Sequence, residues 1–95
     1  MNQNYDIDAM EKATIAMIVS LVDPYVDPPD GFEVDQSIPE SGVLDSRAVL
    51  ELVIWFEQAY ELEIPDKDIT QTNLGTIKRM ITYAWRQKKL GHAYP

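Results

Sequence analysis

The chain has 95 residues, of which 45% are hydrophobic, and no cysteine, which allows one small domain and excludes disulfide bonds. Residues 1–45 hold ten acids and one base (net −9), whereas residues 46–95 hold six acids and seven bases (net +1). The N-terminus lacks a basic targeting segment, and no apolar run is long enough to span a membrane. We therefore expect a soluble, cytoplasmic monomer that binds neither nucleic acid nor membranes. Its acidic charge favours partner proteins with basic surfaces.

The first predicted helix covers about residues 6–22. Its apolar residues Ile7, Met10, Ile18 and Leu21 recur at steps that place them on one helical face. Asp6 and Asp8 lie in the first turn, where negative charge suits the helix dipole, and Pro24 ends the helix.

A long connection, residues 23–45, follows this helix and is rich in proline, glycine and acids. A connection of this length is usually functional or disordered. Apolar side chains such as Val26, Phe32 and Ile38 argue against disorder, because they need a packed environment. We expect this loop to lie against the helices.

The second predicted helix runs from about Ser46 to Tyr60 and has two distinct stripes. One stripe is predicted to form the core, and it consists of Val49, Leu52, Val53, Phe56 and Tyr60. The other mixes aliphatic and charged side chains, namely Arg47, Leu50, Glu51, Ile54, Glu57 and Gln58. A purely structural helix does not need aliphatic residues between exposed acids, so we interpret this second stripe as a docking surface. Trp55 lies between the two stripes.

The remaining sequence predicts a short acidic turn at residues 65–69 and a last helix from about Asn73, as its N-cap, to Lys89. Gly91 follows the basic last turn and suits a C-cap. The predicted fold class is all-α: a small four-helix bundle, with three main helices, one short helix and a long first loop. Residues 1–95 form a single domain whose ends, about 1–5 and 90–95, are expected to be loosely ordered.

The segment from Gly42 to Asp66 contains an Asp45-Ser46 pair at the helix start and an Ile64-Pro65-Asp66 exit. It resembles the prosthetic-group segment of the acyl carrier protein family, whose usual pattern is Asp-Ser-Leu, an amphipathic helix and an acidic Ile-Pro-Asp exit. The resemblance extends from Ile7 to about Ala84. It implies that Ser46 is the attachment point for 4'-phosphopantetheine derived from coenzyme A, whose thiol holds an acyl or aminoacyl group as a thioester.

The resemblance further implies a carrier without catalytic activity of its own. Its expected partners are a phosphopantetheinyl transferase and an acyltransferase, adenylating ligase or synthase with a basic docking surface. Asp45 would serve the attachment site by bonding the loop or by helping the modifying enzyme to recognise Ser46, and the residue pattern leaves both roles open. Ile38 stands where carriers usually have an apolar residue that pins the loop.

Several positions depart from the family's common pattern. Arg47 replaces the usual Leu or Met, and Ala48, Gln58 and Ala59 occupy positions that are often acidic in fatty-acid carriers. The segment 40–45 is more similar to stand-alone carriers that serve a ligase, polyketide or nonribosomal pathway. The resemblance therefore favours secondary metabolism, including antibiotic biosynthesis, over a housekeeping fatty-acid role.

Other interpretations stay open. Serine is a preferred N-cap residue, so Ser46 would also suit a purely structural role. The main alternative function is an acidic, helical interaction module without the prosthetic group. Enzymatic activity is disfavoured because the single histidine, His92, lies in the C-terminal tail, where it is poorly placed to form a Ser-His-Asp triad. The sequence also contains two sets of acidic residues: Asp6, Asp8 and Glu11, and Asp23, Asp27 and Asp30. Neither set has the residue spacing of a calcium-binding loop, so we interpret these side chains as solvated.

Overall fold

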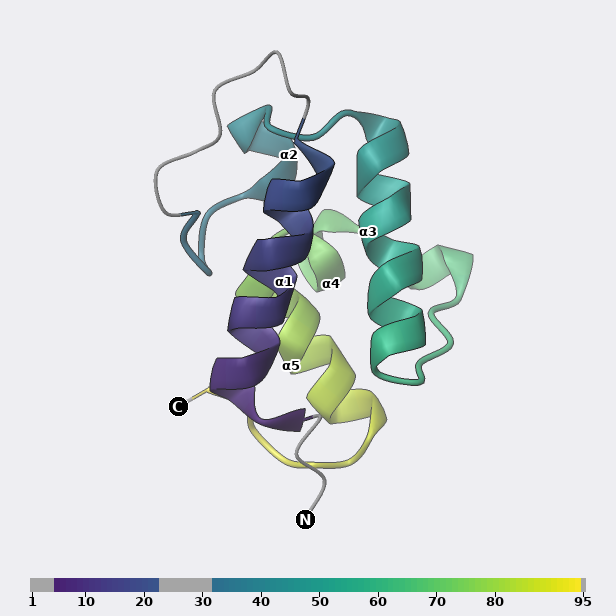
Figure 1. Ribbon diagram of the computed structural model, residues 1–95. Coiled ribbons are helices and arrows are strands. Elements are labelled where there is room, and N and C mark those ends of the chain that lie inside the picture. Colours follow the sequence, from purple (N-terminus) through teal and green to yellow (C-terminus); the bar gives the residue numbers. More distant parts are fainter. Residues whose placement is uncertain (1–4, 23–31, 95) are drawn as a thin grey trace.

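The computed structural model describes residues 5–22 and 32–94, and within these ranges it contains helices and no strand (Figure 1). The all-α prediction is confirmed. The three long helices are α1 (Ile7–Leu21), α3 (Ser46–Ala59) and α5 (Ile77–Gln87). The short ones are α2 (Ile38–Ser41), the 3-10 helix η2 (Asp66–Asp68) and α4 (Gln71–Leu74). The residues Pro24 and Val26 and the acids Asp23, Asp27 and Asp30 lie outside the described residues.

The long helices pack around one core because each has apolar residues at helical spacing. Figure 1 shows α1 and α3 running side by side in opposite directions, and α5 packs against α1. Buried positions on the long helices are Met10, Thr14 and Ile18 in α1, Ala48, Leu52, Val53 and Phe56 in α3, and Ile77, Met80, Ile81, Tyr83 and Ala84 in α5. Thr14 tolerates full burial because its hydroxyl donates to the carbonyl of Met10 at 2.7 Å.

The predicted core stripe of α3 is largely confirmed. Leu52, Val53, Phe56 and Tyr60 are buried, whereas Val49 is half-buried. Ala48 is also buried, close to the start of the helix. The side chains of Phe56 and Tyr60 stack edge to face, with ring centroids 4.9 Å apart.

The connection before α3 contains one helical turn, α2, which the loop prediction missed. Ser37 caps it by accepting from the backbone N–H of Glu40 at 3.3 Å, and Gly42 ends it at φ 71°. The overlooked signal is the Ser-x-x-Glu spacing of a capping box around Pro39. Ile38 is 2% exposed, so the expectation that it pins the loop is confirmed.

The predicted last helix is two helices, and Asn73 is not an N-cap. Thr70 caps α4 by accepting from the N–H of Asn73, and Thr76 caps α5 by accepting from Arg79. Gly75 lies between them because a Cβ there would come within 2.4 Å of the carbonyl oxygen of Gln71. Its own carbonyl accepts from the N–H of Ile38 at 2.8 Å, which joins α2 to this turn.

The end of α5 also differs from the prediction. Its left-handed residue is Lys89, at φ 56°, and the N–H of Leu90 donates to Trp85 at 2.9 Å, so Gly91 lies beyond the cap. The described residues nearest the two termini contact the rest of the fold. Tyr5 and Ala93 are buried, and the hydroxyl of Tyr94 donates to Glu11 at 2.7 Å. None of the described helices has the length and apolar character needed to cross a membrane.

Candidate functional site

The start of α3 is fixed by Asp45 and leaves Ser46 free. Asp45 is the N-cap: its carboxylate accepts from the backbone N–H of Ala48 at 2.8 Å, and its carbonyl accepts from Val49 at 3.0 Å. Leu44, directly before it, is buried and anchors the loop. Ser46 is therefore the first helical residue and not the cap, so the structural alternative for its hydroxyl is wrong.

The chain has four serines, all within the described residues, and their hydroxyl groups differ in their hydrogen bonds. Ser20 donates to the carbonyl of Met17 and Ser41 to that of Ile38, while Ser37 accepts from Glu40. Ser46 is exposed, and its hydroxyl has no hydrogen bond to any described residue. Of the four serines, it alone combines an exposed side chain with a hydroxyl that has no hydrogen bond to a described residue.

The surroundings of Ser46 suit an attached anion. The first N–H groups of a helix have no partner within the helix, and the dipole favours negative charge there. In α3, the capping bonds engage the N–H groups of Ala48 and Val49 and leave those of Ser46 and Arg47. The side chain of Arg47 is exposed beside them. A phosphodiester on Ser46 would find both free amides and a guanidinium.

The second stripe of α3 is on the surface, as the pattern indicates. Leu50 and Ile54 are 54% and 52% exposed, and they lie between the exposed side chains of Arg47, Glu51 and Gln58. These five residues share one helical face that begins at the first turn of α3. We call them the α3 stripe.

Glu57 is placed differently from the other members of the predicted docking set. Its side chain is half-buried, and its carboxylate accepts from the backbone N–H of Ile64 at 2.9 Å. This bond holds the loop after α3 in place, beside the buried Leu62 and Ile64. Glu57 therefore has a structural task at the edge of the α3 stripe. Trp55 is half-buried and packs its ring against Phe56 and Tyr60.

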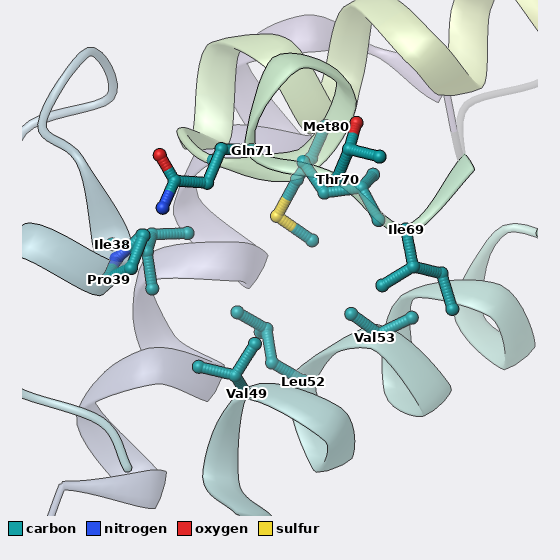
Figure 2. Close-up of a pocket in the computed structure, with 11 residues that line it drawn as sticks. Ile38, Pro39, Val49, Leu52, Val53, Ile69, Thr70, Gln71 and Met80 are labelled. Atoms are coloured by element: carbon teal, nitrogen blue, oxygen red, sulfur yellow. The ribbon is translucent and has the colours of Figure 1, made fainter. Parts of the chain in front are cut away.

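An apolar pocket of about 190 Å³ opens between α2, α3, α4 and α5 (Figure 2). Figure 2 shows Val49 and Leu52 facing Met80 across this space, with Ile38 and Pro39 on one side and Val53 and Ile69 on the other. Thr70, Gln71, Leu74 and Gly75 complete the lining. Val49 is three residues from Ser46, which is about 4.5 Å along the helix axis. No pattern in the sequence predicts this pocket, because its walls come from four separate elements.

Comparison with protein-family models decides the family. The model described as the phosphopantetheine attachment site matches residues 13–84, which is most of the chain. This chain belongs to that family. Comparisons with curated proteins and with solved structures gave no significant match.

Membership agrees with the resemblance seen in residues 42–66 and with the all-α fold. It makes 4'-phosphopantetheine the covalent prosthetic group of this phosphopantetheine carrier. The start of α3 fits such a group, because it combines an exposed hydroxyl, free helix amides and an adjacent cation. Among the described residues, no cluster of acids or His92 has the arrangement of a metal site.

Proposed function

We propose that this protein is an acyl carrier that holds an acyl or aminoacyl intermediate on 4'-phosphopantetheine attached to Ser46 and presents it to partner enzymes. The observation that carries the proposal is the state of Ser46. It is the serine whose hydroxyl is exposed and unbonded among the described residues, at the start of a capped helix in a chain of this family.

Each residue at the start of α3 has a defined task in this proposal. The bound group supplies a thiol that holds the cargo as a thioester. Asp45 keeps the first turn of α3 in shape by capping it, so that the Ser46 hydroxyl stays at the surface. The free N–H groups of Ser46 and Arg47 and the Arg47 guanidinium stabilise the phosphodiester. No residue of the chain acts as a catalyst, and the chemistry belongs to the partners.

The α3 stripe is the proposed docking surface for these partners. Leu50 and Ile54 offer exposed apolar contacts, while Glu51 attracts and orients a basic surface. We propose as partners a phosphopantetheinyl transferase and a loading or condensing enzyme, such as an acyltransferase, an adenylating ligase or a synthase. Arg47, with its unusual cation, supports assignment to polyketide, nonribosomal or other secondary-metabolite biosynthesis.

The apolar pocket is the proposed site for a short cargo. Its volume of about 190 Å³ is below the roughly 300–1,000 Å³ of pockets that bury drug-sized ligands. A chain of a few carbons therefore fits, and a long acyl chain does not. Gln71 and Thr70 at its rim can bond a polar group on such a cargo.

The function is tested by intact mass after incubation with coenzyme A and a phosphopantetheinyl transferase. Wild type and Ser41→Ala should gain one phosphopantetheinyl group, and Ser46→Ala should gain none. Because Asp45 provides the cap, Ser46→Ala should change the stability by only a few tenths of a kcal/mol. Modification of Ser46→Ala, or its mapping to Ser20, Ser37 or Ser41, would refute the assignment. No modification of any variant would favour the acidic interaction module instead.

The docking surface is tested by charge reversal. Glu51→Lys should slow loading and make the remaining rate less dependent on salt, because exposed charges steer partners through a field that salt screens. Glu63→Lys is the matched control, since Glu63 is an exposed acid outside the α3 stripe. Equal loading rates for the two variants would move the docking site elsewhere. Glu57→Lys is a less specific variant because it also breaks the bond to Ile64.

The pathway assignment is tested at Arg47. Arg47→Leu restores the common family pattern and removes a cation from the unfavourable end of the helix dipole. We expect it to weaken loading by enzymes of the native pathway and to improve acceptance by fatty-acid enzymes. Kinetics with both enzyme types measure this, and unchanged rates with both would show that Arg47 does not select partners.

The cargo proposal is tested by thermal unfolding of carriers loaded with acyl chains of increasing length. The melting temperature should rise over the first few carbons and then stop rising, because the pocket is full. Val49→Phe, which fills the pocket from α3, should remove this rise. Leu50→Phe, on the exposed face, should keep it. A melting temperature that does not depend on acyl length would exclude a bound cargo.

A further inference from the structure

The C-terminal tail encloses a second hollow, at the end of the bundle opposite to the start of α3. Figure 1 shows the tail after α5 turning back across this end. The hollow has a volume of about 480 Å³ and is lined by Thr82, Arg86, Lys89, His92 and Tyr94, together with Gly91 and Ala93. None of these residues is an acid, and all but Thr82 lie beyond the residues 13–84 that match the family.

The walls of this hollow are held by specific contacts. Ala93 is buried and anchors the tail. The hydroxyl of Tyr94 donates to Glu11 of α1 at 2.7 Å, and the Lys78 ammonium lies 5.0 Å from the centre of its ring. At the other side, Lys89 takes a left-handed conformation at φ 56°. Contacts from both α1 and α5 therefore hold the tail that borders the hollow.

The charge of this hollow is opposite to that of the chain. Arg86, Lys89 and His92 are exposed around it, although the formal net charge of the protein is −8. The dipole at the end of α5 accounts for cations at Arg86 and Lys89. It does not account for His92, which reaches the same hollow from the tail. Glu11, the acid that approaches from α1, already accepts the hydroxyl of Tyr94.

We propose that this hollow binds the phosphate group of a small molecule. Arg86 offers a planar fork of N–H donors, Lys89 a flexible ammonium and His92 a ring N–H, so donors come from both the helix and the tail. Donors arranged around a space suit a tetrahedral phosphate with a charge near −2. A carboxylate has two oxygens in one plane and one charge, and it satisfies fewer of them. This site is independent of Ser46 and of the proposed carrier function.

The test is a titration of the full chain with inorganic phosphate at low ionic strength, followed by calorimetry and by NMR of the His92 ring. We expect saturable binding, with ring shifts at His92. Arg86→Gln should weaken binding by about tenfold or more, because it removes hydrogen bonds to a charged group. Lys89→Gln should weaken it less, and Lys67→Gln, which removes an exposed cation of η2, should bind as wild type does.

Glutarate serves as the comparison ligand. Tighter binding of inorganic phosphate than of glutarate, a dicarboxylate with a charge of −2, supports a phosphate site, whereas equal affinities overturn that assignment. Titrations that do not saturate, or equal weakening by Lys67→Gln and Lys89→Gln, would reduce the hollow to a general electrostatic effect and overturn the proposal. Circular dichroism of each variant confirms that the fold is unchanged. The substituted side chains are exposed, so loss of structure is not expected.

Discussion

The start of α3 and the opposite end of the bundle are held together by different kinds of contact. At the start of α3, Asp45 caps the helix through a residue only three positions away. At the other end, hydrogen bonds join residues far apart in the chain. The hydroxyl of Tyr5 donates to the carbonyl of Tyr60 at 2.7 Å, the indole N–H of Trp85 to that of Tyr5 at 3.2 Å, and the Lys88 ammonium to that of Glu61 at 2.8 Å.

Because of this difference, the contacts that stabilise the fold lie apart from the residues that partner enzymes are proposed to bind. A partner enzyme can engage Ser46 and the α3 stripe without breaking a long-range bond, because the local cap keeps the first turn intact. The bonds at the other end fix how α1, α3 and α5 are placed relative to one another. A carrier handled by several enzymes benefits from such a division, since its docking face need not contribute to the core.

The largest effect on stability is expected from Tyr5→Ala, which removes long-range contacts at the end of the bundle opposite to the start of α3. Tyr5 is buried, packs against Tyr60 at a centroid distance of 6.0 Å and accepts the Trp85 bond through its carbonyl. Removing its ring should lower the free energy of unfolding by about 3 kcal/mol. Tyr5→Phe loses only a buried hydrogen bond, about 1 kcal/mol. Urea unfolding measures both. Modification of Ser46 in the folded fraction should be unchanged, and a slowed modification rate would show that the two ends are coupled.

A pH effect is expected at Tyr83, whose hydroxyl donates to Asp68 at 2.8 Å and so ties η2 to α5. Burial, with the hydrogen bond to Asp68 adding to it, raises the pKa of Tyr83 from 10.0 to about 12. The fold favours the neutral phenol, so this contribution is complete below pH 10 and is lost as the pH rises to about 12. It amounts to about 2 kcal/mol or less. Tyr83→Phe should lose stability less steeply over this range, and identical slopes would contradict the assignment.

A smaller effect is expected at Asp45, where capping and recognition can be separated. Asp45→Ala removes the cap and should cost about 1 kcal/mol. Asp45→Asn keeps a capping oxygen but loses the charge, and it should remain about as stable as wild type. The rate of phosphopantetheinylation then distinguishes the two roles. A slow Asp45→Asn with normal stability means that the transferase recognises the carboxylate, and a normal rate assigns Asp45 to the cap alone.

The smallest effect is expected at the end of α3. Glu61 has φ 53°, a left-handed conformation that side chains with a Cβ disfavour, and the N–H of Leu62 closes the turn on Glu57 at 2.8 Å. Glu61→Gly should therefore raise the free energy of unfolding by about 0.5–1 kcal/mol. Chemical denaturation compares it with Glu63→Gly, a control outside this turn, which should not be stabilised. A gain in both variants would reflect charge and not conformation.

Local sequence patterns predict those parts of this protein whose structure depends on neighbouring residues. The apolar spacing of α1 and α3 predicted their bounds to within one or two residues, because helical periodicity is a property of neighbouring residues. The Asp45-Ser46 pair and the Ile-Pro-Asp exit indicated the family, which residues 13–84 confirm. The segment before α3 also contains a local signal, because the Ser-x-x-Glu spacing of Ser37 and Glu40 is typical of a helix start.

Features that depend on residues far apart in the chain become visible only in the folded structure. Asn73 looks like a good cap, yet Thr70 and Thr76 cap two helices, because the turn at Gly75 packs against Ile38. The sequence pattern places Glu57 in the predicted docking stripe, but in the fold its carboxylate accepts a hydrogen bond from the backbone N–H of Ile64. The apolar pocket and the basic hollow are each built from segments that meet only after folding. Local pattern cannot reveal such sites, because their walls are close in space and far apart along the chain.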